Sequence, residues 1–229
     1  MEILLLIFVS VVLVGCVVYQ DKQYKKTAYY QVTKNPYSSV KYNKGMYGEY
    51  YAYKRLQALE EGGSKFLFNL YIPRGNEKTT EIDMLLVCSK GLIVFESKNY
   101  SGWIFGNEKN KNWTQTFPAG RGRSHRERFY NPIMQNATHI KHLRRIVGDN
   151  IPIYSIIVFS DHCTLKDVSV YSDVQVVQGY EIFSVVNRLL NQKPDCLGEM
   201  QITQLYIKLY PYSQVGSEVK EKHVEVNGL

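Results

Sequence analysis

The stretch TEIDMLLVCSKGLIVFESK, residues 80–98, decides the fold of this chain. Two runs rich in β-branched and apolar residues, 80–88 and 91–98, flank a short segment that contains Ser89, Lys90 and Gly91. Apolar runs of this length on either side of a glycine-containing turn predict an antiparallel β-hairpin.

Side-chain parity in this hairpin brings two acidic residues and a lysine together. A two-residue turn within 89–91 pairs odd positions of the first strand with even positions of the second, and side chains alternate between faces. Asp83, Glu96 and Lys98 are therefore expected on one face, at the end of an otherwise apolar surface. Buried charges need partners. The trio fits either a divalent-metal site suited to phosphodiester cleavage or a salt bridge that caps the sheet.

A helix is predicted upstream, over residues 45–61, a stretch without proline. One stripe of this helix, spaced by four and three residues, contains Gly45, Glu49, Ala52, Leu56 and Leu59. Because Glu49 lies on this inward-facing stripe, it is a candidate to join the acids of the hairpin. The alternative is that Glu49 only stabilises the first helical turn, where the helix dipole favours negative charge.

The remaining pattern predicts an α/β fold with the element order αβββαβ. The helix at 45–61 is followed by strands at 65–71, 80–88 and 91–98, a helix at 132–147 and a strand at 152–159. Asn131-Pro132 marks the start of the second helix, since proline is favoured at the first helical position. Gln135 lies off the apolar stripe of that helix. We further expect a strand at 174–177, helices at 180–190 and 197–210, and a flexible polar tail from residue 213.

The composition changes abruptly near the N-terminus. Residues 3–19 carry no charge and are mostly Leu, Ile and Val, a run close to the ~20 residues that span a bilayer as a helix. Lys22, Lys25 and Lys26 follow, and the positive-inside rule places this basic flank and the chain after it in the cytoplasm. The alternative is a lipoprotein signal in which Cys16, at the end of the sequence Leu-Val-Gly-Cys, is acylated.

The other cysteines, Cys88, Cys163 and Cys196, are far apart and form no Cys-x-x-Cys pair. Their spacing favours a reducing compartment and predicts no zinc site. Asp161 and His162 precede Cys163, but no second ligand pair follows at zinc-finger spacing.

The net charge is +7 at pH 7, which favours a polyanionic partner. The candidate nucleic-acid-binding residues are Arg121, Arg123, Arg126 and Arg128 in a glycine-containing loop and Lys141, Arg144 and Arg145 on the following helix. A solvated basic face, or attraction to anionic lipid beside the membrane helix, explains the same charges. Four aromatic residues before this loop either stack on unpaired bases or close a core. They are Trp103, Phe105, Trp113 and Phe117.

Several short motifs occur in a fixed order along the chain. They are Gly45-x-x-Gly48-Glu49, Asn69-x-Tyr71, Glu81-Ile82-Asp83, the run from Gly91 to Tyr100, Gly102, Trp113 and Asn131-Pro132-x-x-Gln135. Together they resemble a nuclease-related (NERD) domain over roughly residues 42–160. The resemblance implies a PD-(D/E)XK, restriction-endonuclease-like core with a mixed central sheet.

The resemblance also implies roles for individual residues. Asp83 and Glu96 would hold Mg²⁺ or Mn²⁺, assisted by the backbone carbonyl of Ser97, and Glu49 would complete the acidic cluster. Lys98 would orient or activate the attacking water. A metal between carboxylates lowers the pKa of its bound water, while a lysine adds positive charge without occupying a coordination position.

Gln135 corresponds to the polar helix position of the family, where it would orient Lys98 or contact a phosphate. The expected organisation is a transmembrane helix at 1–20, a basic juxtamembrane linker at 21–44, a nuclease-like domain at 45–190, a helical extension at 191–212 and a flexible tail at 213–229. The expected function is membrane-anchored, Mg²⁺-dependent hydrolysis of DNA, with RNA less favoured, at the cytoplasmic face. The alternative is a membrane-tethered nucleic-acid-binding or scaffold protein that keeps the nuclease fold without turnover.

Overall fold

The computed structural model describes residues 1–76, 78–118 and 124–227. Its central sheet has five strands in the order β1-β2-β3-β7-β9. These strands are β1 (Lys65–Gly75), β2 (Lys78–Cys88), β3 (Gly91–Lys98), β7 (Ile153–Phe159) and β9 (Gln175–Gln178). The β1-β2 and β2-β3 pairs are antiparallel, whereas β3-β7 and β7-β9 are parallel. A mixed α/β fold is therefore confirmed.

The predicted hairpin and its parity are also confirmed. Leu85 of β2 pairs with Val94 of β3, and Val87 pairs with Leu92, so odd positions face even positions. All four of these side chains are buried. Because a slip of one residue would move every side chain to the opposite face, this apolar pairing holds the register on which the polar end of the hairpin depends.

Two helices cover opposite faces of the central sheet. They are α4 (Lys44–Leu56), extended by the 3-10 turn η1 (Gln57–Glu60), and α5 (Pro132–Val147). A Cβ built on Gly48 of α4 would lie 3.2 Å from the Ser97 hydroxyl, whereas Gln135 of α5 contacts Lys98. Successive residues of a strand point to opposite faces, so α4 and α5 flank β3 from two sides. Asn131 caps α5 as predicted, with Pro132 in its first turn.

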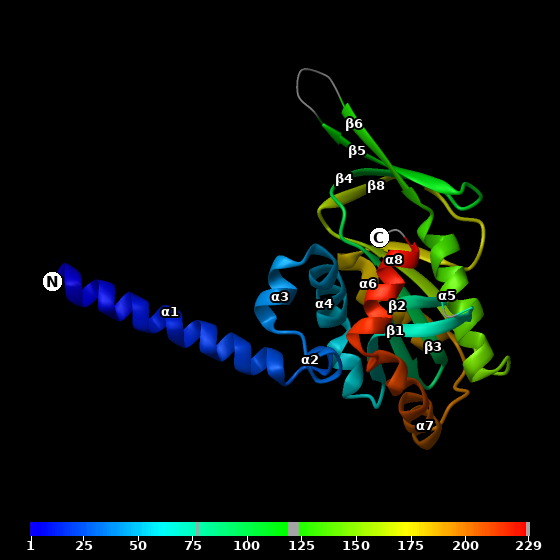
Figure 1. The fold of residues 1–229 in the computed structure, drawn as a ribbon, viewed down its shortest axis with the longest axis horizontal. Coiled ribbons are helices and arrows are strands. Elements are labelled where there is room, and N and C mark those ends of the chain that lie inside the picture. Colours follow the sequence, from blue (N-terminus) through cyan, green and yellow to red (C-terminus); the bar gives the residue numbers. More distant parts are fainter. Residues whose placement is uncertain (77, 119–123, 228–229) are drawn as a thin grey trace.

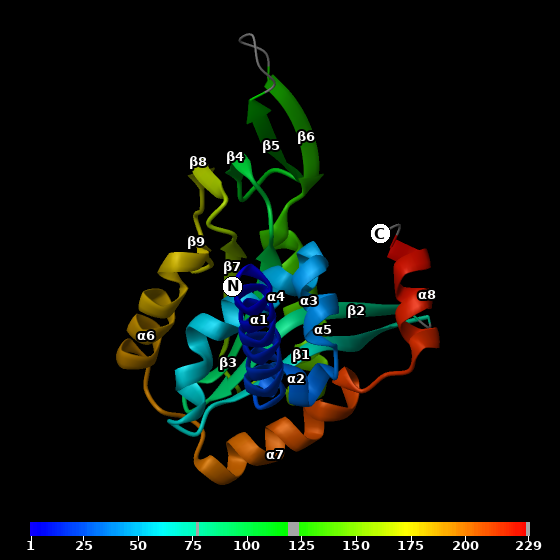
Figure 2. The same cartoon turned by 90° about the vertical axis from the view of Figure 1, so that its left-hand side faces the viewer.

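The C-terminal helices complete the cover of this sheet (Figure 2). The turn η2 (Gly179–Glu181) leads into α6 (Ile182–Gln192), and α7 (Glu199–Leu209) ends in the turn η3 (Tyr210–Ser213). Both helices bury aliphatic side chains in the main core, among them Val186 and Leu209. The predicted strand at 174–177 and the helices at 180–190 and 197–210 therefore exist, with boundaries shifted by one or two residues.

A second, four-stranded sheet was not predicted from the sequence. It has the order β6-β5-β4-β8 and consists of β4 (Gly102–Asn107), β5 (Asn112–Pro118), β6 (Ser124–Tyr130) and β8 (Cys163–Ser169). Figure 1 shows it projecting beyond one end of the central sheet, with β5 and β6 outermost. Trp113 is buried in its small core and stacks on Phe159, whereas the Trp103 side chain is 46% exposed.

The segment 21–44 is folded, which corrects the prediction of a linker. Helix α1 (Glu2–Lys25) is followed by α2 (Ala28–Thr33) and α3 (Tyr37–Tyr42). Tyr29, Val32 and Val40 are buried in the main core, and Tyr24 makes edge contacts with the rings of neighbouring tyrosines. The segment is polar in composition, which led to the prediction of a linker. Its tyrosine rings nevertheless bury a large apolar area.

Helix α1 extends away from the rest of the molecule in Figure 1. Among the described residues it is the one helix long and apolar enough to cross a membrane. Its residues from Ile3 to Tyr19 are exposed to solvent in the isolated chain.

The C-terminal segment also differs from the prediction. The sequence predicts a flexible tail from residue 213, but residues Ser217–Asn227 form helix α8. His223 of α8 is buried, packs edge-on against Tyr71 and is hydrogen-bonded to the hydroxyl of Thr79. Helix α8 is mostly polar and its Val219 and Val224 are exposed, so a helix held by one buried histidine carries no clear periodic signal in the sequence.

Candidate functional site

The polar end of the hairpin lies where the central sheet splits. Met84 and Phe95 form the last backbone pair between β2 and β3. Beyond this pair β2 stays with β1, while β3 stays paired with β7 as far as Lys98. Asp83 lies in the resulting gap, where its Oδ2 accepts a 2.8 Å hydrogen bond from the backbone N–H of Ser97. We call this gap between β2 and β3 the fork. It places Asp83 beside the segment of β3 that contains Glu96 and Lys98.

Glu96 and Lys98 form an ion pair in this fork. The Lys98 Nζ lies 2.6 Å from Glu96 Oε1, and the Glu96 side chain is 1% exposed. On the same side, Lys98 Nζ donates to Gln135 Oε1 of α5 at 3.1 Å. The structure thus brings Gln135 to Lys98, a contact that the resemblance had implied and that spans 37 positions of sequence.

His139 is a member of this site that the sequence analysis missed. Its Nε2 lies 3.0 Å from Glu96 Oε2, and its Nδ1 lies 2.6 Å from the hydroxyl of Thr80. One turn of helix separates His139 from Gln135 on α5. The signal was therefore present in the sequence, because residues i and i+4 of a helix share a face.

Glu49 approaches the site from α4 through two neutral donors. Its Oε2 accepts hydrogen bonds from the Asn69 side-chain amide at 3.2 Å and from the Tyr29 hydroxyl at 3.3 Å. The same Asn69 amide nitrogen also lies 3.2 Å from an oxygen of Glu81. Tyr29 and Glu81 were not predicted as site residues, and no local pattern connects Tyr29 with a glutamate on another helix.

The backbone of Asn69 is held in the left-handed region, with φ of 51°. Phe68 pairs with Met84 and Leu70 with Ile82, so Asn69 stands opposite Asp83 in β2. Left-handed backbone costs roughly 1 kcal/mol for a residue with a Cβ, and asparagine tolerates it best. Such strain within a strand, beside three acidic groups, is typical of functional sites.

Burial and mutual repulsion raise the pKa of two of the carboxyl groups. The pKa of Glu49 rises to about 7, first through burial and then through the charge of Glu81, although hydrogen bonds from Asn69 and Tyr29 oppose the rise. The pKa of Asp83 is raised well above its ordinary value by burial and by the charges of Glu96 and Glu49. Two acidic groups are therefore held near one another at an electrostatic cost.

Lys98 and Glu96 show the opposite balance. Burial alone would raise the pKa of Glu96, but the Lys98 ammonium and His139 outweigh it, so this pKa is lowered. Burial would lower the pKa of Lys98, but the charges of Glu96 and Asp83 outweigh it, so this pKa is raised. Lys98 is thus a fully charged ammonium at neutral pH.

The donor set fits a divalent cation in chemistry, though not in its present arrangement. Within the ranges that the structure describes, no group of three or more His, Cys, Asp or Glu side chains is placed to hold a metal ion. Glu96 uses one oxygen for Lys98 and the other for His139. Hard cations such as Mg²⁺ prefer oxygen donors, and a cation would relieve the repulsion that raises the pKa of Asp83 and Glu49. Each Glu96 oxygen accepts one hydrogen bond in this arrangement and keeps a further lone pair that a cation could share.

The predicted nucleic-acid-binding residues fall into separate groups. Arg121 and Arg123 lie outside the described residues. Arg126 and Arg128 alternate along β6, so they share one face of the second sheet. Arg144 instead donates hydrogen bonds to the carbonyl oxygens of Asp149 and Ile151 and closes the end of α5.

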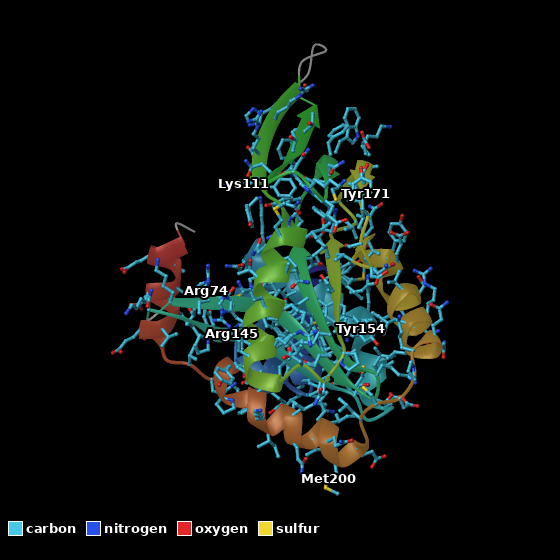
Figure 3. The ribbon with its side chains drawn as sticks, turned by 90° about the vertical axis from the view of Figure 1, so that its right-hand side faces the viewer. Arg74, Lys111, Arg145, Tyr154, Tyr171 and Met200 are labelled. Atoms are coloured by element: carbon cyan, nitrogen blue, oxygen red, sulfur yellow. The ribbon has the colours of Figure 1, made fainter. Side chains whose placement is uncertain are left out.

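A basic surface is present along α5. Burial and the charges of Arg145, Arg74 and Lys141 lower the pKa of His142, so each of these three cations acts on His142, and Arg145 contacts its ring at 3.3 Å. Figure 3 labels Arg145 at α5 and Arg74 at the neighbouring β1-β2 hairpin. Arg74 was not predicted, because a lone arginine at the end of a strand carries no signal in the sequence.

Comparison with known proteins gives two findings. A family model for the nuclease-related domain matches residues 44–160. An uncharacterised protein from Bacillus anthracis is 30% identical over 183 residues, which cover 80% of this chain and 82% of that protein. No solved structure matches the chain significantly.

Proposed function

Because this chain belongs to the nuclease-related domain family, we propose that it is a metal-dependent nuclease tethered to a membrane by α1. The observation that supports this proposal best is the fork between β2 and β3, which gathers Asp83, Glu96 and the charged Lys98 within hydrogen-bond reach of one another or of the same backbone segment. Two helices add Gln135 and Glu49 from opposite faces.

Each residue has a distinct part in the proposed mechanism. Asp83, Glu96 and Glu49 would bind Mg²⁺ or Mn²⁺ with the backbone carbonyl of Ser97. The bound ion supplies a water of lowered pKa and offsets charge on the phosphate. Lys98, released from Glu96, donates to the attacking water or to a phosphate oxygen, because it is an ammonium without an acceptor function.

Gln135 and His139 position these groups. Gln135 accepts a hydrogen bond from Lys98 and so orients the ammonium from the α5 side. His139 is hydrogen-bonded to Thr80 through Nδ1, which leaves Nε2 directed at Glu96. This chain of contacts fixes the Glu96 carboxylate in the manner of an outer-shell partner of a metal ligand.

Placement at the cytoplasmic face of a membrane is part of the same proposal. Helix α1 is long and apolar enough to cross a bilayer, and its C-terminal turn carries Lys22 and Lys25. The positive-inside rule then directs the folded domain to the cytoplasm. Acylation of Cys16 is the alternative anchor, and palmitate labelling that Cys16→Ser abolishes would support it.

A non-catalytic, nucleic-acid-binding role is the second candidate function. The observation that favours it is that, among the described residues, no three His, Cys, Asp or Glu side chains converge on one point where a metal ion could bind. If the carboxylates do not move together, the fork binds no ion and the basic surfaces alone would engage nucleic acid.

A cleavage assay with the full-length chain in detergent micelles distinguishes the two. Plasmid DNA, single-stranded DNA and RNA are incubated with Mg²⁺, Mn²⁺ or EDTA. We expect cleavage, with DNA preferred, that requires the metal and is lost in Asp83→Asn, while the exposed-site control Asp173→Asn cleaves normally. Binding of nucleic acid without metal-dependent cleavage of any of these substrates would refute the nuclease.

Tyr29 offers a further test, because it lies in α2, before the matched region 44–160. Tyr29→Phe removes the hydroxyl that donates to Glu49 and keeps the buried ring. The hydrogen bond is long, at 3.3 Å, and the loss of a typical intramolecular hydrogen bond costs about 0.5–1.5 kcal/mol. Because about 1.4 kcal/mol is a factor of ten, we expect cleavage to fall roughly threefold to tenfold. The control is Tyr30→Phe on the same helix, and equal rates for both variants and the wild type would contradict this role.

A further inference from the structure

A cavity of about 140 Å³ lies beside the fork, on the α4 face of the sheet. Its floor is formed by Ser97 of β3 and Val158 of β7, which are paired neighbours. One wall is the first part of α4, from Tyr47 to Ala52, and the other is the segment Asp161–His162 with Gly179. Lys98 also borders the cavity, although its ammonium is directed to Glu96 and to Gln135 on the α5 side. The cavity and the proposed cleavage site therefore lie on either side of the end of β3.

Three flat side-chain groups stack along α4, those of Tyr47, Tyr51 and Arg55, and together they are called the ladder. Tyr47 stacks on Tyr51 with an interplanar angle of 20° and ring centroids 6.1 Å apart. The guanidinium of Arg55 covers the Tyr51 ring at 4.5 Å from its centroid. These residues are spaced by four along the helix, which places them on one face. Tyr47 lines the cavity and remains 38% exposed.

Hydrogen bonds to Asp161 hold two members of the ladder, Tyr51 and Arg55, in place without a ligand. Asp161 Oδ2 accepts hydrogen bonds from the Tyr51 hydroxyl at 3.1 Å and from Arg55 at 2.8 Å, and Arg55 also contacts that hydroxyl. Asp161 Oδ1 accepts from the backbone N–H of Tyr180. At Gly179 a Cβ would lie 2.9 Å from Asp161 Oδ1, so a larger residue there would displace the carboxylate. Asp161 therefore holds the Tyr51 and Arg55 part of the cavity wall in place.

We propose that this cavity binds an unpaired nucleobase of the substrate strand, stacked against Tyr47, while the strand continues across the end of β3 to the cleavage site at Lys98. The inference rests on the proposed nuclease function. It narrows the substrate to nucleic acid with unpaired bases at the cleavage point: single strands, flaps or frayed ends.

Three features favour a base over other small ligands. Apolar cavities near ~150 Å³ accept a single six-membered ring, and this cavity is of that size. Its wall ends in an exposed aromatic ring, and stacking on such rings binds bases of any sequence. Ser97, Asn99 and His162 place polar groups around the apolar walls, which suits the polar edge of a base. A base within a duplex is stacked on both sides and would have to be flipped out of the helix, at a cost of a few kcal/mol, before it could enter.

The test measures binding without cleavage. Full-length chain in detergent micelles, with EDTA, is titrated into fluorescein-labelled (dT)12 and into the same strand paired with (dA)12, and fluorescence anisotropy gives Kd. We expect Tyr47→Ala to raise the Kd for (dT)12 roughly tenfold, the scale of one base stacking on one ring, and to leave the duplex Kd unchanged. Tyr47→Phe keeps the ring and should bind (dT)12 within about twofold of the wild type.

The matched control is Tyr42→Ala, which removes an 82% exposed ring just before α4. It should bind as the wild type does, and thermal unfolding confirms that each variant is folded. An unchanged Kd in Tyr47→Ala, an equal loss on the duplex, or no (dT)12 binding by the wild type overturns the proposal. Loss of metal-dependent cleavage in Asp83→Asn together with a neutral Tyr47→Ala would refute the base site alone. Tyr47-dependent (dT)12 binding by a wild type that never cleaves would refute the nuclease alone.

Discussion

Lys98→Met is expected to slow metal-dependent phosphodiester cleavage by roughly a hundredfold to a thousandfold. Methionine keeps most of the side-chain volume but removes the ammonium that contacts Glu96 and Gln135. Loss of one preorganised electrostatic contact to the reacting group costs about that factor in enzymes that stabilise oxyanions. The measurement is the initial rate of cleavage in Mg²⁺ for wild type and variant.

Two controls separate catalysis from folding in this experiment. Lys54→Met changes an exposed lysine of α4 whose amine donates a hydrogen bond to Gln57, and it should cleave at the wild-type rate. Lys98→Met also leaves the buried Glu96 without its ion pair, so thermal unfolding is measured alongside. A folded Lys98→Met that cleaves as fast as the wild type would exclude Lys98 from the reaction.

The metal-free protein is expected to lose stability as the pH rises from about 5 to 8, and Glu49→Gln should remove much of this loss. The folded-state pKa of Glu49, about 7, exceeds its ordinary value of 4.5. The folded protein therefore binds a proton that the unfolded chain has already released within this window. Stability from such a group is complete below the lower pKa and disappears as the pH rises through the higher one.

The size of the effect follows from the shift. One pKa unit corresponds to about 1.4 kcal/mol, so the wild type should lose on the order of 2 kcal/mol in its free energy of unfolding, relative to Glu49→Gln. The raised pKa of Asp83 acts in the same direction. Urea unfolding in EDTA at several pH values measures the difference, and Glu199→Gln on α7 is the exposed control. If the free energy of unfolding changes with pH in the same way for the wild type and Glu49→Gln, the pKa of Glu49 is not raised in the folded protein.

Added Mg²⁺ supplies an independent check on the same cluster. An ion that binds only the folded state stabilises it by RT ln(1 + [L]/Kd). Because the carboxylates must be ionised to bind, Mg²⁺ should raise the unfolding temperature at pH 8 and have little effect at pH 5. Asp83→Asn should lose this response. A wild type indifferent to Mg²⁺ at pH 8 would favour the non-catalytic alternative.

The predictions that came from periodicity depended on short-range geometry. The hairpin, the face shared by Asp83, Glu96 and Lys98, and the start of α5 at Pro132 all follow from repeats of two or 3.6 residues and from proline stereochemistry. The second sheet was not predicted from local periodicity, because it depends on long-range pairing: β4 pairs with β8 about sixty positions away. The segment 21–44 was predicted as a linker because its charged and amide residues give it a polar composition. The burial of its tyrosines depends on contacts with the rest of the fold.

The amino-acid sequence by itself determined that this chain has an αβββαβ core, a hairpin ending in two acids and a lysine, and an apolar helix ahead of the domain. Those features rest on alternation, helical spacing and hydropathy, which are local properties of the chain. Only the tertiary structure decided that β2 and β3 separate at Asp83, that His139 occupies the second oxygen of Glu96, that Tyr29 reaches Glu49, and that α4 lines a cavity beside Lys98. Each of these contacts joins residues distant in sequence, and their partners are chosen by how the helices pack against the sheet rather than by any repeat in the chain.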